Sequence, residues 1–177
     1  DLYAYGTLAQ VLKVFDMPDN SKSAIVQGIS RVKILDYTNQ DPYFFAAVES
    51  MDDEPLTDVL EVEALVTNLR QAFDELMKVA PNLTEEHSGM LKNIQKPNRL
   101  TDRAISVITI SNQEKQEILE ELNVKKRIEK ALNLISREIQ RIKLGEEIQS
   151  EVHDEITKTQ REYYLREQMK AIKKELG

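Results

Sequence analysis

The first 54 residues alternate between apolar and polar positions with the period of two that is typical of β-strands. Three stretches follow this pattern and are rich in Val, Ile, Tyr and Phe: residues 7–15, 23–37 and 43–50. The segments between them carry Pro18 and Pro42, which favour turns. The pattern therefore predicts an antiparallel meander, with a kink or bulge at Gly28 inside the second strand.

A lone meander is an incomplete sheet, because it leaves two open edges and an apolar surface with little to pack against. We therefore expect further residues ahead of Asp1 to complete it. Tyr43, Phe44 and Phe45 are consecutive on the third strand, so their side chains alternate between the two sides of the sheet. We expect one side to face the core, with Phe44 or Phe45 in it, and the other side to be open to solvent.

After Pro55 the apolar period changes to that of an amphipathic helix. Residues 57–80 place six apolar side chains on one face: Val62, Leu65, Leu69, Phe73, Leu76 and Ala80. Three shorter helices are predicted over residues 84–94, 97–108 and 113–122. The pairs Asp58 with Glu61 and Ser111 with Glu114 have the spacing of capping boxes. Because the loops between these segments are short, we expect a compact helical bundle.

From Asn123 to Gly177 a single residue, Gly145, interrupts the helical pattern. One helix over this segment would be about 80 Å long, so most of it would project from the bundle. Its first half carries a heptad seam: Ile128, Leu132, Ile135, Ile139 and Ile142. The seam slips near Gly145 before it resumes at Ile148, Val152 and Ile156. A bend at Gly145 and one continuous helix are both compatible with this pattern.

Charge divides the chain of 177 residues into an acidic part and a mildly basic part. Residues 1–123 hold 11 Lys and Arg against 21 Asp and Glu, a net charge of −10, whereas residues 124–177 hold 13 against 10, a net charge of +3. The acidic part disfavours binding to nucleic acid. No membrane span or signal peptide is evident, and the absence of cysteine excludes disulfides and thiolate metal sites.

Catalytic chemistry has no evident basis in these residues. His87 and His153 lie 66 positions apart, and we expect both on helix surfaces rather than at a metal. The acidic clusters at 52–54, 85–86 and 146–147 are expected to be solvated. The basic residues at 125–127 and at 161–174 alternate with glutamates, which favours a salt-bridged, solvated helix face over a nucleic-acid site. No phosphate-binding loop motif occurs.

The stretch "KTQREYYLREQMKAIKKELG" (residues 158–177) closely resembles the end of the amino-terminal region of the Lon family, the ATP-dependent proteases La. "VQGISRVKILDY" and "PYFFAAVE" resemble its β-domain, and "EKQEILEELNVKKRIEKALNLISREI" resembles its helical subdomain. The resemblance implies an α+β fold: a partial, PUA-like antiparallel β-domain over residues 1–54, a helical subdomain over 55–123, and a long projecting helix over 124–177.

The resemblance also implies a function: substrate recognition and assembly for an ATP-dependent serine protease that degrades unfolded, damaged or degron-bearing proteins. The AAA+ module, which uses ATP and Mg²⁺, and the protease module of the family are not in this chain, so we expect no catalytic residue, cofactor or metal here. A homohexamer in the bacterial cytoplasm is implied, with the mitochondrial matrix as the alternative location. A purely structural self-assembly spacer and a free-standing adaptor are the alternative functions.

Four apolar and aromatic residues on the terminal helix are candidate contacts for unfolded protein or for neighbouring subunits: Tyr163, Tyr164, Leu165 and Met169. On a helix that leaves the bundle they would form a soft apolar surface. The alternative is that they pack against the modules absent from this chain.

Overall fold

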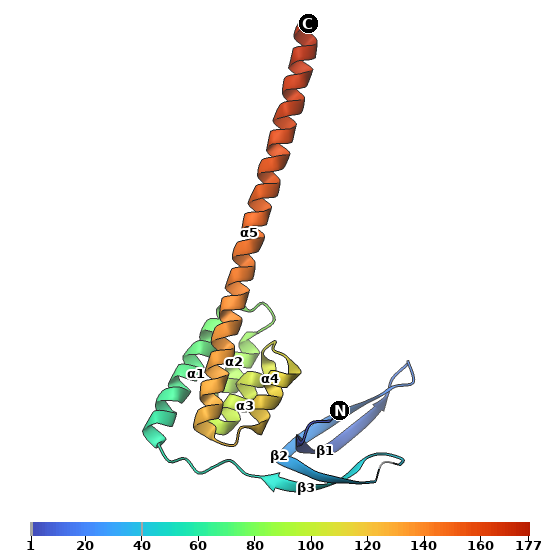
Figure 1. The fold of residues 1–177 in the computed structure, drawn as a ribbon, viewed down its shortest axis with the longest axis vertical. Helices are drawn as coiled ribbons and strands as arrows, with labels where there is room; N and C mark the ends of the chain where they lie inside the picture. Colours follow the sequence, from blue (N-terminus) through green and yellow to red (C-terminus); the bar gives the residue numbers. More distant parts are fainter. Residues whose placement is uncertain (1, 40) are drawn as a thin grey trace.

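The computed structural model describes residues 2–39 and 41–177 and has the predicted α+β architecture. Figure 1 shows a sheet beside a helical bundle, from which one long helix projects. The strands are β1 (Tyr5–Asp16), β2 (Lys22–Asn39) and β3 (Phe45–Met51). The helices are α1 (Val59–Val79), α2 (Glu85–Lys92), α3 (Pro97–Val107), α4 (Asn112–Glu120) and α5 (Val124–Leu176). We call residues 2–39 and 41–51 the β-lobe, and α1 to α4 with the first half of α5 the helical lobe.

The β-lobe is the predicted antiparallel meander, with the strand order β1-β2-β3. Leu8 pairs with Ser30 and the next residue, Ala9, pairs with Gly28, so β2 carries one extra residue at this point. This bulge confirms the prediction at Gly28. A Cβ atom on Gly28 would lie 3.3 Å from Cγ2 of Thr7, so the close approach of β1 explains why glycine suits the position.

The sheet buries little of its apolar surface. Among the residues that the structure describes, Val32 is the one buried apolar side chain of the three strands. The prediction that Phe44 or Phe45 lies in a core is wrong, because their exposed fractions are 60% and 44%. The rings instead pack on Tyr37 and Tyr43 respectively, with ring centroids 5.7 and 4.8 Å apart. No second layer covers the sheet within the described residues, and so the strands have nothing to bury these rings against.

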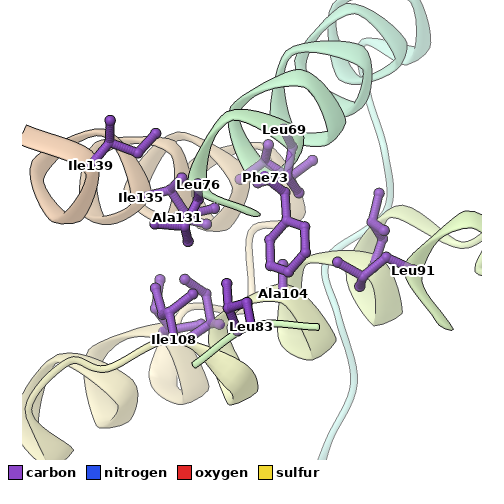
Figure 2. Close-up of a cluster of buried hydrophobic side chains, with 14 of the residues drawn as sticks. Leu69, Phe73, Leu76, Leu83, Leu91, Ala104, Ile108, Ala131, Ile135 and Ile139 are labelled. Carbon is purple, nitrogen blue, oxygen red and sulfur yellow. The ribbon is translucent and has the colours of Figure 1, made fainter. Parts of the chain in front are cut away.

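The hydrophobic core lies in the helical lobe, where α1, α3 and α5 meet. Figure 2 shows Phe73 of α1 pointing towards Ala104 of α3, with Ala131 and Ile135 of α5 close by. The predicted apolar face of α1 is buried, apart from Leu65, which is half-buried. The regular spacing of apolar residues along α1 therefore produces the buried face that the sequence pattern predicts.

Side-chain caps fix where the helices begin. The capping box at α4 is confirmed, since the Glu114 N–H donates to Ser111 Oγ (3.2 Å) and the Ser111 N–H donates to Glu114 Oε2 (2.9 Å). At α1 only half of the predicted box forms: Asp58 accepts from the Glu61 N–H (3.1 Å), while the Glu61 carboxylate pairs with Lys125 Nζ (2.7 Å). That ion pair also ties the start of α1 to the start of α5.

Helix α5 runs without interruption for 53 residues, through Gly145. The structure therefore agrees with the single continuous helix and shows no break at Gly145. The first half packs on the bundle as expected, with Ile128, Ile135 and Ile139 buried. All residues from 143 onwards are exposed, so about 50 Å of helix projects from the helical lobe (Figure 1).

We expect Phe73→Ala to lower the free energy of unfolding by about 3–5 kcal/mol, because the ring is 2% exposed and its loss leaves a cavity between three helices. Leu60→Ala on the same helix is the matched control, since Leu60 is 79% exposed and its truncation should change the free energy by less than about 0.5 kcal/mol. Urea unfolding followed by circular dichroism measures both. Equal losses in the two variants would contradict this assignment of the core.

Candidate functional site

The contact between the two lobes is polar. The apolar core cluster draws all its buried members from residues 62–139 and none from the β-lobe. Side-chain hydrogen bonds cross the junction instead: Gln116 Nε2 donates to the Tyr5 carbonyl (3.0 Å), and Arg31 Nε donates to the Leu119 carbonyl (3.0 Å). Polar contacts therefore place the sheet on the helices.

Four charged side chains form the centre of this junction: Arg31 of β2, Asp53, Asp102 of α3 and Arg127 of α5, which we call the charge cluster. Arg31 Nη2 lies 2.6 Å from Asp102 Oδ1, and Arg31 Nη1 lies 3.6 Å from Asp53 Oδ1. Arg127 pairs with Asp53 and lies 3.6 Å from Asp102. The side chain of Arg127 is fully buried. Each arginine therefore contacts both carboxylates, so the two positive and two negative charges balance.

Neutral partners hold the same carboxylate and guanidinium groups. Asn98 Nδ2 donates to Asp53 Oδ2 (2.7 Å), and Arg127 Nε donates to the Glu121 carbonyl (2.7 Å). Burial acts to raise the pKa of Asp53, but the hydrogen bonds from Arg127 and Asn98 and the charges of Arg127 and Arg31 together hold that pKa below its usual value. Asp53 is therefore ionised at neutral pH.

A hollow of about 830 Å³ adjoins the charge cluster between the lobes. Thr7 and Ile29 line it from the sheet, Arg99 lines it from α3, and Lys115 lines it from α4. Its walls thus combine apolar and charged groups from both lobes. Its shape depends on how the β-lobe sits against the helices.

The charge cluster corrects two expectations. The sequence predicts that Asp53 is solvated with Asp52 and Glu54, but it is half-buried and bound by an arginine. The sequence also predicts Arg127 on a solvated helix face, but it is buried. Both errors have one cause, because the two partners lie 74 positions apart and only the tertiary fold brings them together. The one local indication that Arg127 is buried is its position directly before Ile128, the first residue of the heptad seam.

The candidate contacts on α5 are all exposed, with exposed fractions of 67% for Tyr163, 62% for Tyr164, 50% for Leu165 and 58% for Met169. They do not share one face. At about 100° per residue, Leu165 and Met169 lie on the same side of the helix and Tyr163 lies on the opposite side. Tyr164 falls between them, and its hydroxyl oxygen accepts from Gln168 Nε2 (2.9 Å).

Two apolar stripes on α5 result from this arrangement. Ile172 and Leu176 extend the side that carries Leu165 and Met169, whereas Val152 and Ile156 lie on the side of Tyr163. All of these side chains are exposed. The distal part of α5 thus offers two separate apolar surfaces, where the sequence suggested one.

The β-lobe exposes more large apolar side chains than the distal helix. Its exposed large apolar and aromatic side chains include Leu8, Val11, Leu12, Val14, Phe15, Ile25, Val26, Ile29, Leu35, Phe44, Phe45 and Val48. Neighbours such as Val14 and Phe15, in a regularly paired part of β1, point to opposite sides of the sheet, and both are exposed. Both faces of the sheet are therefore apolar and accessible within the described residues.

The described residues hold no group of three or more histidine and carboxylate side chains that could bind a metal ion. His87 contributes to a helix cap, because its Nδ1 accepts from the Thr84 N–H (3.1 Å), and His153 is exposed on α5. None of the helices within residues 2–39 and 41–177 contains an apolar segment of the length that a membrane span requires. The candidate functional sites in the described residues are therefore the polar junction and the exposed apolar surfaces.

Comparison with known proteins identifies the family. The model of the ATP-dependent protease La (LON) substrate-binding domain matches residues 1–137. The chain belongs to this family. Lon proteases from Syntrophus aciditrophicus and Koribacter versatilis are 37% and 42% identical to it, each over the whole chain. The chain spans about a fifth of their length, 22% in both cases.

A solved structure supports the fold of this Lon substrate-binding domain. The N-terminal domain of Mycobacterium avium complex Lon protease matches with a TM-score of 0.64 over 75% of this chain and 70% of that chain. The sequence identity is 20%, so this likeness concerns the fold alone. The resemblance inferred from the sequence motifs is confirmed by the family match.

We expect Asp53→Asn to lower the free energy of unfolding by about 2–4 kcal/mol at pH 7, since it leaves Arg127 buried with too little negative charge. Because the pKa of Asp53 is lowered in the folded protein, its contribution is present above the ordinary carboxyl pKa of about 4 and is lost as the pH falls through the folded value. The free energy of unfolding should therefore fall less for the variant than for the wild type between about pH 5 and about pH 2, the range in which carboxyl groups ordinarily titrate.

Asp52→Asn is the matched control, because Asp52 is the exposed neighbour. Urea unfolding at several pH values measures the wild type and both variants. A loss in Asp53→Asn no larger than in Asp52→Asn would show that the charge cluster does not stabilise the fold.

Proposed function

We propose that this chain is the substrate-capture and assembly region of a Lon-like ATP-dependent serine protease that degrades unfolded, damaged or degron-bearing proteins. Membership of the LON substrate-binding domain family supports this class of function. The observation that carries the proposal is the exposed apolar surface on both faces of the β-lobe. Folded proteins rarely leave so much apolar surface in water, and we propose that the part of it not covered by the residues expected ahead of Asp1 binds unfolded protein.

Unfolded proteins differ from folded ones in exposing apolar side chains, whatever their sequence. A surface that buries such side chains gains free energy in proportion to the apolar area removed from water. The β-lobe offers such a surface on a hydrogen-bonded framework of three strands. This mode of recognition needs no catalytic residue, metal or cofactor in the capture region.

Helix α5 would set the distance between the capture region and the rest of the enzyme. It is anchored in the helical lobe by Ile128 and Ile135 and then projects freely. In the complete enzyme, modules outside this chain would use ATP and Mg²⁺ to unfold the captured protein and cleave it. We place that enzyme, as a homohexamer, in the cytoplasm of a bacterium, in keeping with the bacterial Lon proteases that resemble this chain.

Self-association through α5 is a second candidate function. The stripe formed by Ile148, Val152 and Ile156 is exposed along one side of the projecting helix, and such a stripe suits packing against another helix. Sedimentation velocity at several protein concentrations distinguishes the two functions. A monomer that binds unfolded protein supports capture alone, whereas a concentration-dependent oligomer that ignores unfolded protein supports an assembly spacer.

We expect the chain to bind a permanently unfolded protein more tightly than its folded counterpart, because only the unfolded form exposes apolar segments that the β-lobe can bury. Fluorescence anisotropy without nucleotide measures both affinities. Val11→Thr with Val26→Thr, a cross-strand pair on the exposed sheet, should weaken binding by roughly five-fold or more, the equivalent of about 1 kcal/mol. Equal affinity for the two forms would refute capture by this chain.

The α5 candidates need their own test. If the side that carries Leu165 and Met169 contacts unfolded protein, the double variant Leu165→Ala, Met169→Ala should weaken binding, whereas Tyr163→Ala on the opposite side should not. The same anisotropy assay measures both variants, with circular dichroism to check that the helix persists. Equal effects from the two sides would rule out this face as a specific contact.

A further inference from the structure

We propose that the charge cluster is a clasp that fixes the orientation of the β-lobe relative to α5. It joins three elements that are far apart in the sequence: β2 through Arg31, α3 through Asp102 and the first turn of α5 through Arg127. Asp53, in the connection that follows β3, pairs with both arginines. The same four side chains therefore hold the sheet and the base of the projecting helix.

The buried apolar core of the helical lobe does not supply this orientation. The buried core ends within the helical lobe, and the β-lobe contributes no side chain to it. Two packed apolar surfaces tolerate only small displacements, because any separation exposes area to water. A junction made of a few polar contacts has no such restraint, so the orientation of the sheet depends on the few directional bonds that cross it.

The covalent connection does not supply it either. Residues 52–58 join β3 to α1 without helix or strand structure over most of their length, and Figure 1 shows them as an extended segment. Two polar contacts tether this segment near the start of α5, namely the Glu54 N–H to the Leu122 carbonyl (3.0 Å) and Asn123 Nδ2 to Glu54 Oε2 (2.7 Å). They hold one point of the connection, but one point cannot fix the rotation of the sheet.

Arg31 is the part of the clasp that belongs to the β-lobe. Its guanidinium group contacts Asp102, Asp53 and the Leu119 carbonyl at the same time. Contacts in three directions define a rotation as well as a position. Loss of Arg31 should therefore widen the range of orientations of the sheet, because the bond from Gln116 to the Tyr5 carbonyl restrains a single point of β1. Arg127 retains Asp53, and the helical core keeps its packing.

Pulsed electron-spin distance measurements test this proposal on the 177-residue chain. The chain contains no cysteine, so labels can be introduced at chosen pairs of sites. Labels at Gln10 of β1 and Gln140 of α5, both exposed, report the orientation between the lobes. We expect Arg31→Gln to broaden that distance distribution by roughly two-fold or more relative to wild type, as for domains without an apolar interface.

Three controls make the result decisive. Lys33→Gln removes a positive charge from the same strand, outside the charge cluster, and should leave the distribution narrow. Label pairs within one lobe, Glu63 with Gln140 and Gln10 with Glu49, should stay narrow in every variant. The proposal is overturned if Arg31→Gln leaves the inter-lobe distribution unchanged, if Lys33→Gln broadens it equally, or if a pair within one lobe broadens as well.

Discussion

The packing of α1 against the first half of α5 is the interaction on which the rest of this molecule depends. Leu69, Phe73 and Leu76 of α1 meet Ile128 and Ile135 of α5, and all five side chains are buried. Helices α2, α3 and α4 complete the enclosure around them. Because this core fixes the first turns of α5, it also fixes the direction in which the remaining part of the helix leaves the bundle.

The two lobes are stabilised by different physical effects. Burial of apolar area holds the helical lobe together, whereas the β-lobe relies on its hydrogen-bond ladder and on the polar junction with the helices. Asp53 and Arg127 show how the junction offsets part of the cost of buried charge, since each carries an ionic partner and further hydrogen bonds, although Arg127 Nη1 is buried without a hydrogen-bond partner. The directions and distances of these hydrogen bonds and ion pairs fix the orientation of the β-lobe. Because they do not use its apolar side chains, the apolar surface of the sheet stays available.

That availability connects the fold to the proposed capture of unfolded protein. A sheet buried under its own second layer would have no apolar surface left to offer. In the described residues Val26 and Phe44 remain accessible, although they belong to the residue types that normally fill a core. The projecting part of α5 carries the chain about 50 Å away from the helical lobe.

The sequence by itself determined the elements, the family and the main core face. Local spacing carries this information, because the periods of a strand and of a helix are properties of neighbouring residues; the bulge at Gly28 and the capping box at Ser111 were found in this way. Only the tertiary structure decided that Asp53 and Arg127 are partners, that Phe44 and Phe45 are exposed, and that α5 continues unbroken through Gly145. Those outcomes depend on which distant segments meet, on whether a second layer covers the sheet, and on the uninterrupted course of the helix. The spacing of adjacent residues does not determine any of the three.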